Sequence, residues 1–152
     1  MANVANVEFR NAVEKIGEYA RNFTGSKPVF TEPPNLVFPL AKTDIRFGNV
    51  TIGVFVMLLP GKTAPDVTIN VTVCHFPKEN LVAFFRQLLN WNNLETDVAH
   101  FYINDQLGTV QLGLKRPVQD FDYSEFVHTV QTISSLTMNY VLILTKQWGI
   151  TN

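Results

Sequence analysis

The stretch from Leu81 to Trp148 constrains the fold of this chain more than any other part of the sequence. Apolar residues recur at helical spacing from Lys78 to Asn92, and again over the last part of the stretch. Between these two helices, Ala99 to Ile103 and Thr109 to Lys115 have the composition of short strands, and the turn between them ends in Gly108. A helix, a hairpin and a second helix in succession predict a compact α+β arrangement.

The last helix carries clear signals at both ends. Asp122 and Glu125 have capping-box spacing, in which each side chain accepts a hydrogen bond from the backbone N–H of the other residue. Gly149 follows Trp148 and suits a helix C-cap. The stripe expected to face the core consists of Phe126, Val130, Ile133, Thr137, Tyr140 and Leu144.

The first half of the chain predicts one helix followed by strands. Residues 4–23 place apolar side chains at spacings of three and four. Prolines interrupt the next segment, so Leu36-Val37-Phe38 is expected to form no more than a short edge strand. Asp44 to Leu59 is rich in β-branched and aromatic residues, and Gly48-Asn49 can form a two-residue turn or a bulge that divides it into two strands. Val67 to Phe76 alternates like a strand with one face on the core.

These elements predict the fold class and the domain organisation. Their order is α-β-β-β-α-β-β-α, which is typical of an α+β fold with helices packed on a single antiparallel sheet. At 152 residues the chain is long enough to bury a core of its own. We therefore expect a single α+β domain that spans residues 1–152.

The composition adds an argument about the surface. Apolar residues make up 46% of the chain and charged residues only 16%, and 12 residues are phenylalanine. With so few charges, apolar side chains must cover part of the surface, and large apolar patches mark interfaces or binding grooves. The sequence therefore predicts a homodimer or an apolar groove.

Charge and hydropathy argue against two classes of partner. The formal net charge is -1, whereas nucleic-acid-binding domains carry clustered basic residues, and the nearest approach to a cluster is Lys115-Arg116. The longest apolar run, Val54 to Leu59, is too short to cross a bilayer. The first ten residues lack the pattern of a secretory signal. Neither nucleic acid nor a membrane is expected as a partner, and the expected location is the cytoplasm.

The residues capable of chemistry are scattered along the sequence. His75, His100 and His128 lie far apart, and none has a second ligand at a metal-binding spacing. Cys74 is the only cysteine, so no intrachain disulfide can form, and in a strand its side chain and that of His75 point to opposite faces. Gly61-Lys62-Thr63 lacks the upstream glycine of a phosphate-binding loop. No catalytic residue, metal ligand or cofactor is predicted, and the chain is not expected to be an enzyme.

One catalytic alternative stays open. His100 or His128 with a nearby carboxylate could serve a small hydrolase or a ligand-binding enzyme. Helix capping and solvated loops explain the acidic residues with fewer assumptions, so we prefer the non-catalytic interpretation. The acidic residues concerned are Glu95, Asp97, Asp120 and Asp122.

The block from Asn80 to Trp148 carries a family resemblance. It consists of a helix ending in Leu88-Leu89-Asn90, two hairpin strands, and a helix opening with Tyr123-Ser124-Glu125-Phe126. The hairpin strands are His100-Phe101-Tyr102-Ile103 and Val110-Gln111-Leu112-Gly113-Leu114. In hydrophobicity and element order this block resembles the type III secretion chaperones and their YbjN-like relatives, and the preceding helix and strands fit the same order.

The resemblance implies a non-enzymatic α+β domain that tends to dimerise. In the chaperones it also implies binding of extended segments of a partner protein along apolar patches. These chaperones are commonly strongly acidic, whereas this chain is nearly neutral. The resemblance therefore supports the predicted fold more strongly than it supports a role as the chaperone of a secreted protein.

The predicted interface lies on the second helix and on the second hairpin strand. The apolar arc of that helix is wider than one sheet face needs, which indicates that it is covered on two sides. The residues expected to make the contacts are Phe84, Leu88, Trp91, Gln111 and Lys115. The predicted function is a non-catalytic protein-binding or assembly module, which forms a homodimer or binds an extended segment of another protein.

Overall fold

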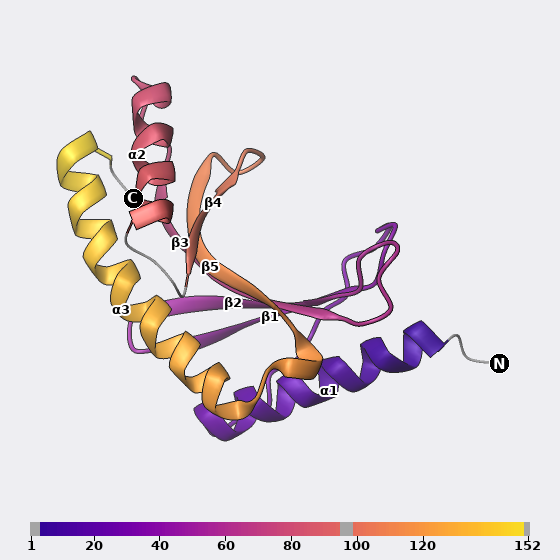
Figure 1. The fold of residues 1–152 in the computed structure, drawn as a ribbon. Coiled ribbons are helices and arrows are strands. Elements are labelled where there is room, and N and C mark those ends of the chain that lie inside the picture. The colour runs from indigo at the N-terminus through magenta and orange to yellow at the C-terminus, as the bar shows by residue number, and fades with distance from the viewer. Residues whose placement is uncertain (1–3, 95–98, 151–152) are drawn as a thin grey trace. The chain divides into compact units, whose positions relative to one another are not determined.

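The elements along the chain confirm the predicted fold class. The computed structural model describes residues 4–94 and 99–150, and Figure 1 traces them. The elements are α1 (Val4–Thr24), β1 (Leu40–Phe47), β2 (Val50–Met57), β3 (Asp66–His75), α2 (Leu81–Leu94), β4 (His100–Asn104), β5 (Thr109–Pro117), the short 3-10 helix η1 (Val118–Asp120) and α3 (Tyr123–Trp148). The strands form one antiparallel sheet in the order β1-β2-β3-β5-β4, as expected for this α+β fold.

The chain clusters into two compact units. The first comprises Met1–Ile69 and Lys115–Val130, and the second comprises Asn70–Leu114 and Gln131–Asn152. The unit boundaries fall inside β3, β5 and α3, so each of these elements contributes residues to both units.

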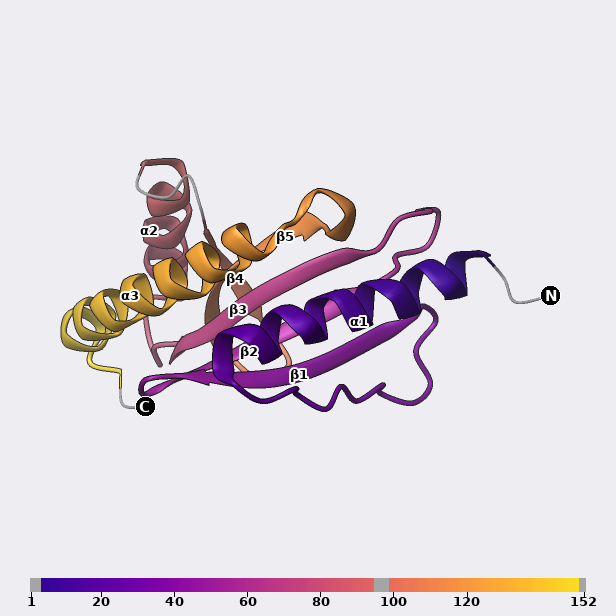
Figure 2. The same cartoon turned by 90° about the horizontal axis from the view of Figure 1, so that it is seen from below.

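In the first unit, α1 lies along the hairpin of β1 and β2 (Figure 2). The two strands pair in antiparallel register, with Ile45 opposite Ile52, and both of these side chains are buried. Gly48 has a φ of 59°, in the left-handed region, and forms the predicted turn with Asn49. The stripe of α1 buried in this unit is Phe9, Ala12, Ile16, Gly17 and Ala20.

The first turns of α3 and the segment before it also pack on α1. Lys15 Nζ donates to the carbonyl oxygen of Val118 at 2.8 Å, and the Tyr19 hydroxyl donates to that of Phe121 at 3.3 Å. The capping box is confirmed, since the N–H of Glu125 donates to Asp122 Oδ1 at 2.8 Å. The reverse bond joins the N–H of Asp122 to Glu125 Oε2 at 3.0 Å.

In the second unit, aromatic side chains join α2 to the later part of α3, which lies beside it (Figure 1). The ring centroids of Phe84 and Trp148 are 5.3 Å apart, and those of Trp91 and Tyr140 are 5.1 Å apart. The indole Nε1 of Trp148 donates to Gln87 Oε1 at 3.1 Å. The wide apolar arc of α2 therefore has a structural role, because much of it packs on α3.

The prediction of an edge strand at Leu36-Val37-Phe38 is wrong. This segment has no strand structure, and β1 begins only at Leu40, after the last proline of the segment. A bridge to the outer side of β1 comes from Thr31, whose N–H donates to Lys42 O at 2.8 Å and whose carbonyl accepts from Lys42 N at 2.9 Å. Proline cannot donate to a ladder, and this accounts for the short contact.

The start of α2 also differs from the prediction. The helix begins at Leu81, three residues after the expected Lys78. Asn80 has a φ of 59°, which is not helical, and its carbonyl accepts from the N–H of Phe84 at 3.0 Å. A residue in the left-handed conformation before the first helical turn sets this boundary.

Candidate protein-binding surfaces

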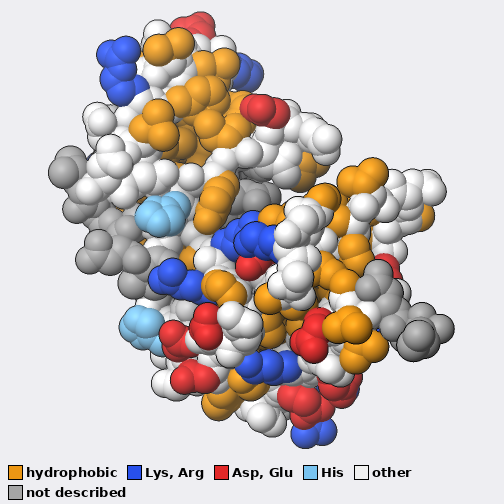
Figure 3. Space-filling view, turned by 45° about the vertical axis from the view of Figure 1, so that its right-hand side comes forward, with side chains coloured by type: hydrophobic (Ala, Val, Ile, Leu, Met, Phe, Trp, Pro, Cys, Tyr) orange, Lys and Arg blue, Asp and Glu red, His pale blue; other side chains and the backbone are white. Residues whose placement is uncertain are grey.

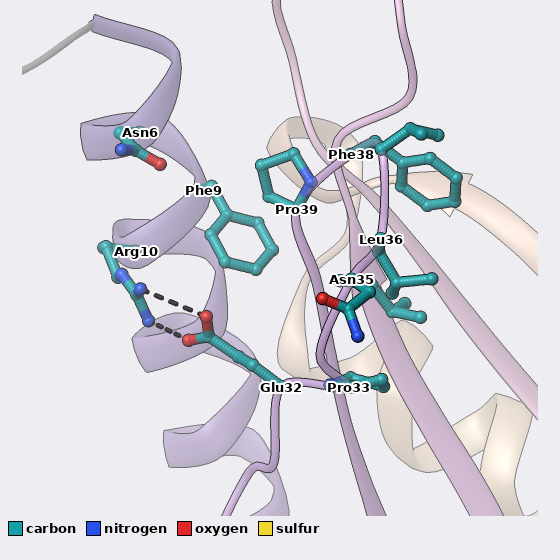
Figure 4. A pocket seen from close by; sticks show the side chains of 11 residues that line it. Asn6, Phe9, Arg10, Glu32, Pro33, Asn35, Leu36, Phe38 and Pro39 are labelled. Atoms are coloured by element: carbon teal, nitrogen blue, oxygen red, sulfur yellow. Dashed lines mark hydrogen bonds and ion pairs between the residues drawn. The ribbon is translucent and has the colours of Figure 1, made fainter.

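A hollow of about 310 Å³ opens between α1 and the segment that precedes β1. Figure 4 shows Phe9 pointing from α1 into this hollow, toward Pro39. Leu36 and Phe38 lie on the far side of the segment from α1 (Figure 4). The walls combine aromatic, proline and aliphatic side chains with two asparagines and the Arg10–Glu32 pair.

A second hollow, of about 410 Å³, continues from the first. Both are lined by Asn6 and by Val37-Phe38-Pro39, and the second extends to residues 58–62. The Val37 side chain is 90% exposed and that of Leu36 is 43% exposed. We call these two hollows together the α1 groove.

Ion pairs hold the segment that walls the α1 groove. Arg10 of α1 forms a two-pronged ion pair with Glu32, which Figure 4 shows as two dashed lines. Lys27 Nζ lies 2.5 Å from Glu14 Oε1 and 3.5 Å from Glu18 Oε1. The hydrogen bond to Glu14 raises the pKa of Lys27, so this lysine stays charged at neutral pH. The charges along this part of α1 are therefore compensated, and the groove is lined mainly by uncharged side chains.

The second unit exposes apolar side chains on α2 and on the β4–β5 hairpin. Val82 and Leu89 of α2 are 74% and 63% exposed, and Ile103 and Leu107 are 47% and 66% exposed. Hydrophobic side chains gather in the upper part of Figure 3, at the height where Figure 1 places α2 and β4. We call these four residues the α2–β4 patch.

The predicted interface residues occupy different environments. Phe84 and Leu88 are buried in the core of the second unit, and Trp91 is half-buried against Tyr140. Gln111 is half-buried on β5, and the exposed Lys115 lies 3.4 Å from Asp66. Phe84 and Leu88 therefore lie beneath the outward-facing residues of α2, among which Val82 and Leu89 are exposed, and the interface itself stays a prediction.

The residues considered for catalysis are dispersed. His75, His100 and His128 are all exposed, and no ion pair to an acid is seen for any of them within residues 4–94 and 99–150. Cys74 is buried, and this burial raises the pKa of its thiol to about 11. In the described part of the chain, no three His, Cys, Asp or Glu side chains are grouped so that they could hold a metal ion.

The acidic residues weighed for catalysis do not converge on a histidine. Asp122 caps α3, and Asp120 is an exposed residue of η1. Glu95 and Asp97 lie outside the described residues. His75 does line a hollow with Lys78 and Glu79, but all three side chains are exposed. No site for general acid–base catalysis is seen among the residues described.

None of the described helices has the length and hydropathy needed to cross a bilayer.

The sequence interpretation missed the α1 groove because it treated Leu36-Val37-Phe38 as a strand. A usable signal was present, since three apolar residues flanked by Pro34 and Pro39 cannot easily fold back into a core. The exposed residues of α2 were missed for a different reason. A helix that is apolar nearly all round does not reveal from its sequence which side another helix will cover.

Comparison with known proteins identifies the fold. No protein-family model and no curated protein sequence matches this chain. A chain of the ExsC–ExsE complex is 19% identical, with a TM-score of 0.60 over 87% of this chain and 95% of that chain.

Two further solved structures share the arrangement. A chain of the heterodimeric ExoU–SpcU complex of the Pseudomonas aeruginosa type III secretion system is 12% identical, with a TM-score of 0.55 over 83% of this chain and 94% of that chain. The Yersinia pestis type III secretion chaperone SycH, in complex with a fragment of YscM2, gives 10% identity and a TM-score of 0.57 over 87% of this chain and 98% of that chain. A relation to YbjN-like proteins stays a prediction. The chain has the fold of the type III secretion chaperones.

Proposed function

We propose that this protein is a non-catalytic binding module that holds an extended, largely apolar segment of another protein in the α1 groove. The observation that carries the proposal is that Val37, which lines both hollows together with Pro39, is 90% exposed. Exposed apolar side chains that line a concave surface are typical of sites for protein partners. The structural neighbours support this reading, since each was solved in complex with another protein.

The backbone of residues 32–39 gives the groove a wall of fixed conformation. Residues 32–39 contain three prolines, and Asn35 has a φ of 63°, so this wall is fixed outside any helix or strand. A partner would gain affinity mainly from apolar side chains placed in the two hollows. Burying such side chains contributes about 25 cal/mol per Å².

Peptide binding tests the proposal. An array of short synthetic peptides rich in Leu, Ile, Val and Phe would be screened by fluorescence polarisation against the full chain. We expect Val37→Asp to weaken the best binder at least about tenfold, which corresponds to about 1.4 kcal/mol. Val29→Asp is the matched control, because Val29 is 80% exposed and does not line the groove. Equal loss in both variants, or no binder in the array, would contradict the proposal.

We also propose that the chain forms a homodimer through the α2–β4 patch. The patch exposes four large apolar side chains on two neighbouring elements, and uncovered apolar surface favours association. Sedimentation at micromolar concentration should give twice the chain mass, and Leu89→Glu should give the monomer. Leu142→Glu is the control, since Leu142 is 71% exposed on α3 outside the patch. A wild-type monomer would refute the proposed dimer.

Finally, we propose that residues 1–152 fold as a single domain. The support is that β3, β5 and α3 each contribute residues to both compact units, so separating the units would cut through two strands and a helix. Calorimetric and van't Hoff enthalpies of unfolding should agree. Two separate transitions would show two domains.

A further inference from the structure

The outer edge of β4 is occupied at its centre by a side chain of α2. β4 is last in the strand order, so its outer side has no neighbouring strand. Asn92 fills that position at Phe101. Its Oδ1 accepts from the N–H of Phe101 at 2.7 Å, and its Nδ2 donates to the carbonyl oxygen of Phe101 at 3.2 Å. A single carboxamide thus satisfies both backbone groups of one strand residue.

Asparagine is suited to this task because its side chain copies a peptide group. The carboxamide offers one acceptor and two donors in a plane, whereas a carboxylate offers only acceptors and a hydroxyl is too short to bridge both groups. The two bonds repeat what a neighbouring strand would supply at that residue.

The pairing with β5 shows which groups of β4 face outward. Phe101 lies opposite Leu112 and Ile103 lies opposite Val110. In an antiparallel pair, alternate residues turn their N–H and carbonyl groups toward the partner strand and away from it. Because Phe101 bonds outward to Asn92, Ile103 also turns its backbone outward, and its side chain is 47% exposed. An added strand would need both residues.

We propose that Asn92 is an edge lock, which prevents β4 from pairing with the same strand of a second copy of this chain. An open edge strand is a template for strand addition, and proteins cover such edges to prevent it. β4 would pair with itself in an antiparallel, two-fold arrangement centred near Phe101, because the same groups meet on both copies. Asn92 occupies the hydrogen-bonding positions at the centre of that arrangement. Association through the side chains of the α2–β4 patch does not need these positions.

Two measurements test the lock in the full chain. Amide hydrogen exchange at Phe101 should be slow in the wild type and at least about tenfold faster in Asn92→Ala, because the bond that protects this amide is lost. Sedimentation should show that Asn92→Ala forms species larger than the wild type, whatever the mass of the wild type. Asn93→Ala is the matched control, since Asn93 is exposed one residue further along α2, and it should change neither result.

A double variant identifies the edge itself. Adding His100→Lys to Asn92→Ala should restore the wild-type mass, because an exposed lysine on an edge strand opposes pairing and His100 lies on β4 outside the α2–β4 patch. Asn92→Leu serves if the alanine variant does not fold, since leucine keeps the approximate size of the side chain but offers neither the acceptor nor the donor. Unchanged exchange at Phe101 overturns the lock. Fast exchange without larger species also overturns it, because the contact would then be purely structural. The comparison with the wild-type mass separates this outcome from failure of the proposed dimer.

Discussion

Lys62 Nζ lies 2.8 Å from Oδ2 of Asp66, a carboxylate whose side chain is only 4% exposed. Lys115 Nζ approaches the same oxygen at 3.4 Å. Lys62 belongs to the loop before β3, Asp66 begins β3, and Lys115 belongs to β5. One buried acid thus ties three segments of the first unit together, next to the backbone bond from Val118 N to Pro65 O at 2.9 Å.

We expect Asp66→Asn to lower the free energy of unfolding by about 1–3 kcal/mol, because a hydrogen bond between charged groups is worth more than a neutral one. The amide preserves size, so packing changes little. Urea unfolding measures the effect. Asp44→Asn, at an exposed position on β1, should stay within about 0.5 kcal/mol of wild type. A similar loss in both variants would argue against a role for the buried ion pair.

The capping box of α3 predicts a second stability effect. Asp122→Ala should cost about 1 kcal/mol, because the N–H of Glu125 loses its acceptor at the end of the helix. Asp120→Ala removes the same charge two residues earlier, at an exposed position without this bond. Thermal unfolding followed by circular dichroism would compare the two, and equal midpoints would contradict the capping role.

Thr137 predicts a stabilising substitution. Its hydroxyl is buried on α3 and has no hydrogen-bond partner among the described residues. Valine has nearly the same shape and no polar atom to bury. Thr137→Val should therefore raise the free energy of unfolding by about 1 kcal/mol. Thr145→Val is the control, because the Thr145 hydroxyl donates to Val141 O at 2.6 Å and gains nothing from removal. Destabilisation by Thr137→Val in urea would show that the hydroxyl is satisfied.

The burial of the Cys74 thiol leads to two predictions, one for its reactivity and one for the pH dependence of the free energy of unfolding. Burial raises its pKa to about 11, from 9.0 for the accessible thiol. At a pH between these values the unfolded chain loses the thiol proton and the folded chain keeps it. The stability that the protonated thiol contributes to the folded chain is therefore fully present below pH 9 and is lost as the pH rises toward 11.

The free energy of unfolding, measured from pH 8 to pH 10.5, should therefore fall more steeply in the wild type than in Cys74→Ala. A thiol reagent should label the folded chain far more slowly than the chain in denaturant. Parallel pH profiles, or fast labelling of the folded chain, would count against a buried, protonated thiol.

Local patterns were enough to identify most elements. Gly48-Asn49 predicted the β1–β2 turn, Asp122 and Glu125 predicted the start of α3, and the alternation from Val67 to Val73 predicted the buried face of β3, because each depends on residues close in sequence. The errors occurred where proline or a left-handed Asn80 changed a boundary, since such conformations have weak sequence signals.

The sequence alone determined the α+β class, the order of helices and strands, and the absence of familiar catalytic and cofactor motifs, because periodicity and spacing are properties of the chain. Only the tertiary structure decided which apolar residues are covered. Phe84 and Leu88 are buried by packing in the second unit, while Val37, Val82 and Leu89 stay exposed. It also brought Asn92 to the edge of β4. Hydropathy is the same for a residue in the core and on the surface, and only the packing of distant segments distinguishes the two.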